Sequence, residues 1–396
     1  MNQGVLYLTY TGLLEPLGQS QVLAYQERLA GDRQIHIVSF ERPEDLADSG
    51  KVNALRERVR GAGIHWHPRR YHKRPSALAT LWDILVGSLL GMKLVHHHGL
   101  GIVHARSYVA SVMALLIKRF TGARYLFDMR GFWADERVDG GLWPRDGRMY
   151  RLAKWFEQRF LLSADHVVSL TQAGVNEMQH FDYLQGRMPP TTVISTCADL
   201  QRFSPGKAEK SEAFTLGYVG SVGTWYLFDE AVAAFNAVRA RKSNARFLII
   251  NRDNHPFIKQ RLQAAGVPMT CVELRKASPE EVPGQICRMH AGVFFIKPVF
   301  SKQASAPTKL AELLGCGIPC LSNTGVGDMA QILVGENVGV AVNAMDTKSI
   351  TAGVEALFEL CADPSIAQRC IATAQRHFSL TEGTARYHSI YISLSN

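Results

Sequence analysis

The sequence of 396 residues lacks the features that mark several classes of protein. Its seven cysteines are scattered, odd in number and without a CxxC pair, which argues against a disulfide scaffold or a zinc site. No apolar run reaches the roughly 18 residues that a membrane span needs. No basic region with a small-residue cleavage site precedes the first apolar run, GVLYLTY, so we expect no signal peptide. These absences predict a protein of the reducing cytoplasm.

The bulk composition is that of an ordinary globular protein. Hydrophobic residues make up 46% of the chain and charged residues 20%, enough apolar material for a substantial core. A chain of this length is expected to form two domains, or three.

The net charge of +9 is concentrated in residues 51–74. The basic residues of this segment, against the single acid Glu57, are Lys51, Arg56, Arg58, Arg60, Arg69, Arg70, Lys73 and Arg74. Such a patch suits nucleic acid or an anionic membrane. We favour the membrane and expect no nucleic-acid partner, because no nucleic-acid-binding motif is present and an apolar helical pattern, residues 78–89, follows. We expect that helix to lie mainly in the core. The adjacent histidines 96–98 do not share a helix face, so no metal site is expected there.

Short β-rich runs alternate with helical patterns along the first half of the chain. Helices are expected at Gln19–Ala30, Tyr108–Phe120 and Met149–Leu162. Strands are expected at Val5–Tyr10, Ile35–Phe40, Ile64–Pro68, Ile102–Ala105, Tyr125–Met129, Val167–Leu170 and Thr192–Ser195. This alternation is typical of a parallel, doubly wound sheet. Ligands of such sheets bind at the carboxyl ends of the strands, so the loop that leads to Gly18 is expected to face the site.

A second alternation follows a linker-like composition at Gly206–Glu212. Its strands are expected at Thr215–Val219, Arg246–Asn251, Thr270–Glu273, Gly292–Ile296, Pro319–Ser322 and Val338–Val342. A helix is expected to start at Ser278, with Glu281 as its capping-box partner. The predicted architecture is two Rossmann-like, doubly wound parallel-sheet domains that face each other across a cleft. We place the first at residues 1–202, closed by a C-terminal helix at 378–396, and the second at 203–377.

The stretch SAPTKLAELLGCGIP, Ser305–Pro319, has the pattern of a short helix that binds an anion. Ser305 or Thr308 is placed to cap its first turn, from which Lys309 projects. Glu312 follows one turn later on the same face, spaced to reach a sugar hydroxyl beside the anion. A solvated Lys–Glu pair on an amphipathic helix is the alternative.

The loop GYVGSVGTWY follows the first strand of the second half. Gly220 and Gly223 allow close approach of a ligand, and Ser221 and Thr224 supply hydroxyls for phosphate oxygens. The loop is not GxGxxG, has no Walker lysine, and no acidic residue ends the next strand, so a nicotinamide site is poorly supported. Together with Lys309 and Glu312 it predicts a cradle for a diphosphate.

Three segments resemble the group 1 glycosyl transferases, family 4 of the glycosyltransferases, which have the GT-B fold. VISTCADLQRFSP (residues 193–205) resembles the interdomain segment, PTKLAELLGCGIPCL the donor-binding helix, and HFSLTEGTARYHSIY (residues 377–391) the closing helix. The similarity runs from the first strand to the tail.

Three positions depart from the family pattern. The donor motif usually has two glutamates with seven residues between them. Here the second is Glu312, but the first position is occupied by Ala304. The usual Arg and Lys after the first strand of the second domain are missing, and Lys297, Lys302 and Lys309 are the candidates to supply that charge instead. Arg106 stands where the family often has a histidine.

The resemblance implies transfer of a hexose from a nucleoside-diphosphate sugar with retention of configuration and without an essential metal or a cofactor. Lys309 then stabilises the leaving diphosphate. Further donor-binding residues are expected among Gly18, Gly220, Ser221, Gly223, Thr224, Arg275, Lys302, Ser305, Thr308 and Glu312. We expect a UDP-linked rather than a GDP-linked donor. The sequence does not identify the sugar, the linkage or the oligomeric state.

The first half contributes FDMRGFWADERVDGG, residues 127–141, which is rich in charge. Arg106, Asp128 and Arg130 lie at the ends of neighbouring predicted strands and are expected to act in catalysis. The alternatives are a structural Asp–Arg pair and, for Arg106, a plain surface arginine. Trp133, Glu136 and Arg137 are expected to bind the acceptor. We expect His104 to point to the opposite face and to belong to the core.

Other functions remain open. A sugar-nucleotide epimerase or sugar phosphorylase shares the two-domain fold, and a catalytically silent sugar-nucleotide-binding subunit of a polysaccharide assembly would explain Ala304. We favour a cytoplasmic transferase, peripheral on the inner face of a membrane through residues 51–74, with a lipid-linked or polysaccharide acceptor.

Overall fold

The computed structural model describes residues 3–206 and 210–396, and it divides into two compact units. Unit 1 consists of Met1–Ser195 with Leu380–Asn396, and unit 2 of Thr196–Ser379. The sequence placed these boundaries at residues 202 and 378. Part of the expected linker, residues 207–209, lies outside the described residues.

Unit 1 is built on a seven-stranded parallel sheet with the order β3-β2-β1-β4-β5-β6-β7. Its strands are β1 (Gly4–Thr9), β2 (Ile35–Glu41), β3 (Ile64–Arg70), β4 (Leu100–Arg106), β5 (Arg124–Asp128), β6 (His166–Ser169) and β7 (Thr191–Val193). Its helices are α1 (Pro16–Gly18), α2 (Ala24–Leu29), α3 (Pro43–Ala47), α4 (Ser49–Gly61), α5 (Ser76–His98), α6 (Ser107–Thr121), α7 (Trp133–Asp139), α8 (Arg148–Ser163), α9 (Gln172–Gln179) and α17 (Leu380–Ser395). A π-helical turn, η1 (Gln19–Leu23), precedes α2, and η2 (Asp182–Leu184) is a 3-10 turn.

Unit 2 is built on a six-stranded parallel sheet with the order β10-β9-β8-β11-β12-β13. Its strands are β8 (Thr215–Val219), β9 (Arg246–Ile250), β10 (Val272–Arg275), β11 (Ala291–Val293), β12 (Cys320–Asn323) and β13 (Gly339–Val342). Its helices are α10 (Phe228–Arg241), α11 (His255–Ala264), α12 (Val282–Ile286), α13 (Thr308–Gly315), α14 (Met329–Gly335), α15 (Thr347–Ala362) and α16 (Ile366–Phe378). Two 3-10 turns are η3 (Met269–Cys271) and η4 (Phe300–Ala304).

The predicted fold class is confirmed, since both sheets are parallel and each has the strand order of a doubly wound sheet. Every strand expected from the sequence is present within a few residues of its predicted bounds. In each unit the strand order reverses beside the first strand, at β1/β4 and at β8/β11. Ligands of open α/β sheets bind outside the carboxyl ends of the strands at this switch point.

Two local predictions need correction. Ser278 does not start a helix, because α12 begins at Val282. The capping-box bond does form, from the Ser278 amide to Glu281 Oε2 at 2.7 Å, but it closes a turn that precedes the helix. The predicted helix from Gln19 begins as the π-helical turn η1 rather than as an α-helix.

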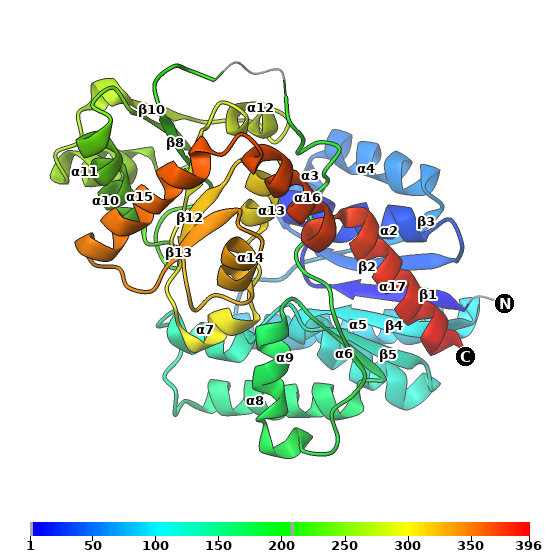
Figure 1. Ribbon diagram of the computed structural model, residues 1–396. Coiled ribbons are helices and arrows are strands. Elements are labelled where there is room, and N and C mark those ends of the chain that lie inside the picture. The colour runs from blue at the N-terminus through cyan, green and yellow to red at the C-terminus, as the bar shows by residue number, and fades with distance from the viewer. Residues whose placement is uncertain (1–2, 207–209) are drawn as a thin grey trace. The chain divides into compact units, whose positions relative to one another are not determined.

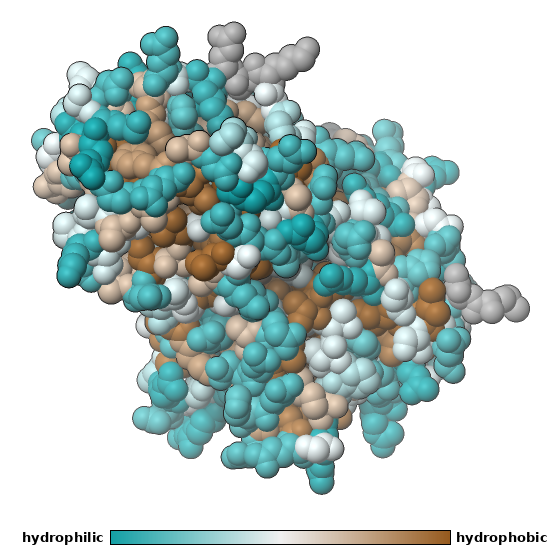
Figure 2. Space-filling model, viewed as in Figure 1, coloured by the Kyte–Doolittle hydropathy of each residue, from teal (hydrophilic) through white to brown (hydrophobic). Residues whose placement is uncertain are grey.

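The last helix, α17, returns to unit 1 and packs against α2 and β4 (Figure 1). The chain leaves α16 through Ser379, which has the extended angles φ −65° and ψ 126° and therefore ends one helix before the next begins. Tyr387 and Tyr391 of α17 are buried in unit 1. Hydrophilic residues predominate on the face shown in Figure 2, with hydrophobic residues set between them.

The helix α5 differs from the expectation of a core helix. Its buried face carries Gly87 and Gly91, where a Cβ atom would lie 2.6 Å from Met113 and 2.4 Å from Ile117 of α6. Because the glycine face of α5 packs against α6, the large apolar side chains of α5 lie on the opposite face of the helix. Leu78, Leu81, Trp82, Leu85 and Leu89 are all exposed, Leu78 by 67%. These five residues form the apolar stripe of α5, or α5 stripe.

By length and composition α5 is also apolar enough to cross a membrane, contrary to the expectation from the sequence. The segment Ala77–His98 has a mean hydropathy of 1.6. Core helices of soluble proteins pass the same test, and α5 packs on α6 and on the sheet, so this alone is weak evidence.

Candidate functional site

The first candidate site lies in unit 2, at the first turn of α13. The helix begins at Thr308 with Pro307 as its N-cap residue, and the side chain of Pro307 makes no capping bond. The expected cap by Ser305 or Thr308 is therefore wrong. Lys309 projects from the first turn, as predicted, but its side chain is buried, with only 7% exposed.

Three aromatic rings surround the Lys309 ammonium. Its Nζ atom lies 3.6 Å from the ring centroid of Tyr226, 5.1 Å from that of Tyr218 and 5.3 Å from that of Phe294. No hydrogen-bond acceptor for this Nζ lies within the described residues. Burial lowers the pKa of Lys309 to about 7, although Glu312 counteracts this effect. An unpaired buried ammonium is costly, so the arrangement suits an anionic ligand that would pair with it.

The glycine-rich loop after β8 passes directly beside this ammonium. A Cβ atom on Gly220 would lie 3.4 Å from Lys309 Nζ, so the absence of a side chain opens the approach to the charge. Gly220, Gly223 and Thr224 have φ of 101°, 79° and 50°, a left-handed conformation that is strained for the threonine. Ser221 and Thr224 are exposed on this loop.

Hydrogen bonds to the protein interior fix the loop. Asn251 Nδ2, at the end of β9, donates to the Gly220 carbonyl at 2.9 Å. The Tyr218 hydroxyl donates to the Ser221 carbonyl at 2.6 Å, and the amide of Lys297 donates to the carbonyl of Trp225 at 2.9 Å. The loop is thus held in place before any ligand arrives, which favours tight binding.

Glu312 lies one turn along α13 and is half-buried. Burial raises its pKa, and the positive charges of Lys309 and Arg202 partly offset this effect. The predicted pair is therefore electrostatically coupled rather than solvated, which removes the alternative of a plain surface Lys–Glu pair for Lys309.

The remaining predicted donor residues are dispersed. Lys302 is buried, and its Nζ lies 3.9 Å from the ring centroid of Trp225 in the same loop. Arg275 ends the edge strand β10 and donates to Glu273 and Gln285, both at 3.1 Å. These contacts hold Arg275 on the sheet edge, away from the β8/β11 switch point.

Gly18 lies in unit 1, where its role is set by packing. A Cβ atom there would lie 1.9 Å from the Gly12 carbonyl oxygen. The amides of Leu13 and Leu14 in the same loop donate to the buried carboxylate of Glu41 at 2.9 and 3.0 Å. A carboxylate of the chain itself therefore occupies the amide groups that a ligand of this loop would use.

The second candidate site lies in unit 1, at the ends of β4 and β5. The predicted catalytic residues Arg106, Asp128 and Arg130 are brought together here. Asp128 Oδ2 lies 3.9 Å from Arg106 Nη1, and Asp128 Oδ1 lies 3.8 Å from Arg130 Nη1. Arg130 has φ of 61°, a strained backbone of the kind found at functional sites.

The ion pairs of this cluster are too long for hydrogen bonds. Asp128 Oδ1 and Arg106 Nη1 are buried without a hydrogen-bond partner among the described residues. Burial alone would raise the pKa of Asp128, but Arg130, His104 and Arg106 together hold it below its usual value. The carboxylate is thus ionised and able to accept a hydrogen bond from a donor such as a hydroxyl.

The sequence argument expected His104 to point away from this cluster, and that expectation is wrong. His104 and Arg106 are two residues apart in β4 and therefore share a face of the strand. The Nε2 atom of His104 lies 3.7 Å from Asp128 Oδ2. Its Nδ1 atom is 2.7 Å from the hydroxyl of Tyr391 in α17. Burial lowers the pKa of His104, which favours the neutral ring.

The predicted acceptor residues Trp133, Glu136 and Arg137 lie on α7. The guanidinium of Arg137 lies 5.0 Å from the Trp133 ring centroid, and Trp133 meets Trp143 edge to face at 5.2 Å. Phe132, directly before α7, is buried against Phe181.

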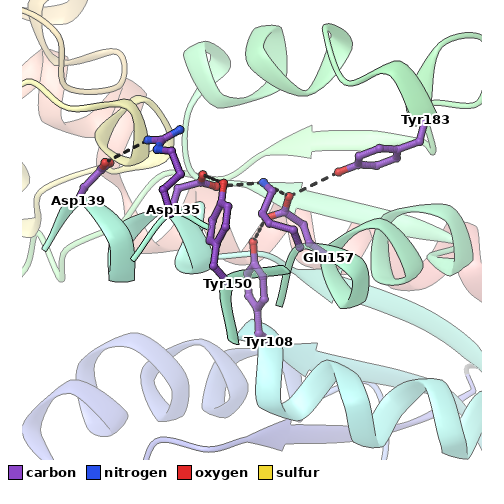
Figure 3. A network of polar contacts seen from close by, with 8 residues as sticks. Tyr108, Asp135, Asp139, Tyr150, Glu157 and Tyr183 are labelled. Atoms are coloured by element: carbon purple, nitrogen blue, oxygen red, sulfur yellow. Dashed lines mark hydrogen bonds and ion pairs between the residues drawn. The ribbon is translucent and has the colours of Figure 1, made fainter. Parts of the chain in front are cut away.

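Sequence reasoning missed a polar network behind α7 and α8 (Figure 3). Tyr108 and Tyr183 point toward Glu157, and Tyr150 points toward Asp135, to which its hydroxyl donates at 2.7 Å. Lys154 bonds both carboxylates. Burial raises the pKa of Glu157 despite Lys154 beside it. Sequence reasoning also missed the aromatic rings around Lys309. The pair Trp225–Tyr226, directly after the glycines of the loop, was a signal that could have predicted them.

No group of three or more metal-ligating side chains occurs in the parts of the chain that the structure describes.

Comparison with known proteins identifies the first half of the chain. Residues 19–196 match the family described as "Glycosyl transferase 4-like domain". The resemblance to the family 4 glycosyltransferases is thereby confirmed. No curated protein matches the sequence.

Solved structures share the whole fold. Sucrose-phosphate synthase from Thermosynechococcus elongatus is 13% identical with a TM-score of 0.74, over 99% of both chains. Anabaena HepE in complex with UDP and glucose is 12% identical with a TM-score of 0.70, over 99% of this chain and 100% of that one. The lipopolysaccharide outer core galactosyltransferase WaaB is 11% identical with a TM-score of 0.65, over 98% of this chain and 99% of that one. At these identities the likeness establishes the GT-B fold.

Proposed function

Because the chain carries a glycosyl transferase 4-like domain within a GT-B fold, we propose that it transfers a hexose from a UDP-sugar with retention of configuration. The acceptor in this proposal is a lipid-linked or polysaccharide intermediate of cell-surface glycan synthesis. The observation that carries the proposal is the buried, unpaired ammonium of Lys309 beside Gly220.

The diphosphate of the donor would complete the site of Lys309. Its phosphate oxygens would accept from the ammonium, from the first-turn amides of α13 and from the hydroxyls of Ser221 and Thr224. These groups are fixed in place before the reaction, so they stabilise the charge that builds on the leaving diphosphate. In this proposal the protein's own cations do the work that a bound metal ion does in other transferases. Glu312 accepts from the ribose hydroxyls.

The Asp128 cluster of unit 1 supplies the acceptor side of the proposal. The ionised carboxylate accepts a hydrogen bond from a sugar hydroxyl, and Arg106 and Arg130 keep it ionised. The separations of 3.7–3.9 Å around Asp128 are too long for direct hydrogen bonds, so its oxygens keep the capacity to accept one from the substrate.

The choice of UDP over GDP is supported by solved structures of similar fold that contain UDP. The similar HepE structures hold UDP or UDP-glucose. The preference for UDP in this proposal therefore rests on the likeness to these structures.

Donor hydrolysis tests the proposal without knowledge of the acceptor. Purified protein is incubated with UDP- and GDP-hexoses, and release of the nucleoside diphosphate is followed while NMR records the anomer of the freed sugar. We expect slow release of UDP from one donor, with the anomeric configuration retained at early times. Binding of a sugar nucleotide without release from any of them would overturn the proposal.

That contrary outcome corresponds to the second candidate, a silent sugar-nucleotide-binding subunit. The observation that favours it is Ala304, which is 1% exposed and places a methyl group where the family usually has a carboxylate. In that case the donor site would bind its ligand but would lack a contact to the sugar.

We also propose a cytoplasmic location, peripheral on the inner membrane face. Two cations of the segment 51–74 are ion-paired within unit 1, Lys51 with Asp45 and Arg58 with Glu27. Others, including Lys73 and Arg74, are exposed directly before the apolar stripe of α5. Such a combination suits an anionic bilayer. Flotation with anionic vesicles at low salt that is lost at high salt supports this location, and its absence at low salt contradicts it.

A further inference from the structure

An apolar cavity of about 120 Å³ lies in unit 1 among the helices α5, α6, α7 and α8. Its lining includes Ile84 of α5, Val112 of α6, Trp133 of α7 and Leu152 of α8. Every lining residue is aliphatic or aromatic, Tyr108 among them. A cavity without polar lining is a poor site for water or for a sugar, which needs hydrogen-bond partners, and a good site for hydrocarbon.

The walls of this cavity are held from behind by the polar network of Figure 3. The Tyr108 ring contacts Trp133 at 5.4 Å, while its hydroxyl points the other way and donates to Glu157. Lys154 bonds both Glu157 of α8 and Asp135 of α7. The network therefore fixes α7 against α8 and α6, and the cavity between them is a built feature rather than a packing defect.

The cavity is continuous with exposed apolar surface. Met149 and Leu152 line it and are 50% and 48% exposed, so it opens to the outside. Ile84 connects it to the α5 stripe, since Leu81 lies one turn away on the same helix. Most of the large hydrophobic side chains that are exposed among the described residues belong to residues 78–162. An apolar surface of this extent marks an interaction site.

Positive charge lies at the cavity wall and on the exposed side of α8. Arg148, Arg151 and Arg159 are exposed on α8, and Arg159 lies 5.0 Å from the ring centroid of the exposed Trp155. Arg137 lies over Trp133 at the cavity wall. Arginines beside an apolar cavity complement a ligand that has an apolar chain and a phosphate head group.

We propose that this cavity takes the hydrocarbon chain of the acceptor's lipid anchor, with the anchor's phosphate held by Arg137 at the cavity wall. The inference rests on the proposed transferase function and names the acceptor class as a lipid phosphate or diphosphate. The α5 stripe lies on the bilayer, and the chain passes from the bilayer into the cavity without crossing water. The apolar cavity, its supporting network and Arg137 at its wall all follow from this one occupant.

Tryptophan quenching by a brominated chain tests the proposal, with 12-bromododecyl phosphate as the probe. Bromine quenches indole fluorescence on contact, and Trp133 and Trp143 both line the cavity. We expect saturable quenching in the wild type and in Trp82→Phe, which removes the indole of the α5 stripe. We expect at least a tenfold weaker apparent affinity in Val112→Phe, which fills the cavity. Leu116→Phe, one turn along α6 and outside the lining, is the matched control and should behave as the wild type.

The outcomes separate the possible sources of the signal. Quenching that is lost in Trp82→Phe but unchanged in Val112→Phe would place the chain on the α5 surface and overturn the proposal. Vesicles of dibrominated phosphatidylglycerol that quench Trp133 and Trp143 and resist displacement by farnesyl phosphate would assign the cavity to bulk lipid, which also overturns it. Displacement by farnesyl phosphate supports the lipid-phosphate acceptor.

Two further measurements keep the result interpretable. Ala153→Leu fills the same cavity from α8, so agreement between the two filled variants excludes a local folding defect as the cause. The thermal shift with UDP, which reports only on unit 2, is measured on each variant. A normal UDP shift with no probe quenching in the wild type overturns the lipid site alone, whereas loss of both argues against the transferase function itself.

Discussion

The Nζ atom of Lys309 lies 3.6 Å from the centre of the Tyr226 ring and has no hydrogen-bond acceptor within the described residues. The aromatic faces offset part of the desolvation of the ammonium, since a cation over a ring gains roughly 0.5–2 kcal/mol. They cannot replace a counter-ion, and the pKa of Lys309 accordingly falls to about 7. The site thus holds its charge at a cost to stability that a bound anion would recover.

Replacement of Lys309 should therefore stabilise the protein and abolish donor binding at the same time. Lys309→Met removes the buried ammonium and keeps the apolar stem, so we expect a higher melting temperature without ligand. One kcal/mol corresponds to roughly 2–4 °C in a domain of this size. The exposed Lys259→Met of α11 serves as the control and should change neither property. A lower melting temperature for Lys309→Met would show that the ammonium is already paired.

Donor binding should take up a proton above neutral pH. Free Lys309 is half-protonated near pH 7, and a diphosphate beside it favours the ammonium, so its pKa rises on binding. We expect uptake of close to one proton per UDP at pH 8.5 and little at pH 5.5. Calorimetry in buffers of different ionisation enthalpy measures this number. An equal uptake in Lys309→Arg, whose side chain stays protonated, would assign the proton to another group.

Asp128→Asn should reduce turnover without weakening UDP binding. The variant keeps the shape of the side chain but removes the charge that faces Arg106 and Arg130. We expect a rate loss on the order of 10²-fold and destabilisation of about 3–5 kcal/mol from the two unpaired arginines. The exposed Asp146→Asn is the control. Unchanged donor hydrolysis and transfer rates would reduce the cluster to a structural ion pair.

A histidine cluster in unit 1 should make its stability depend on pH. His36 Nδ1 lies 3.0 Å from His67 Nε2, the His65 ring stacks on the His36 ring, and the His98 ring lies tilted against it at 4.3 Å. Burial first, and then the neighbouring histidines, lower the pKa of His36 to about 3, while burial with His65, Arg69 and His98 lowers that of His67 to about 4. Unfolded histidine titrates near 6.5, so the unfolded state binds more protons below that pH.

The resulting stability is fully present above about pH 6.5 and is lost as the pH falls toward 4. Urea unfolding followed between pH 7.5 and 4.5 should show the midpoint fall in this window, and His36→Phe should flatten the dependence. An equally steep fall in His36→Phe would move the effect to other groups.

Much of the fold was predictable because it depends on local patterns. The strands of both sheets follow from apolar runs between turn residues, and the parallel order follows from the helices between them. Arg106, Asp128 and Arg130 were correctly brought together because neighbouring parallel strands end at the same sheet edge. The helix of Lys309 and Glu312 was found from its proline, its glycines and its charges.

The rest depends on contacts that sequence spacing does not encode. Tyr218, Tyr226 and Phe294 reach Lys309 from a strand, a loop and the end of another strand. The exposure of the α5 leucines follows from the close contact of Gly87 and Gly91 with α6, which the hydrophobic pattern alone did not reveal. The hydrogen bonds of Arg275, on the edge strand, to Glu273 and Gln285 could likewise not be predicted from local sequence patterns.

The most direct measurement of the donor site is the thermal shift of the protein with UDP, GDP and ADP. A ligand at about 100 times its dissociation constant adds roughly 2.7 kcal/mol to the stability, which amounts to several degrees. The account predicts such a shift with UDP for the wild type and for Lys259→Met, a reduced one for Glu312→Ala and none for Lys309→Met. A full UDP shift in Lys309→Met, or no shift with any nucleoside diphosphate in the wild type, would contradict it.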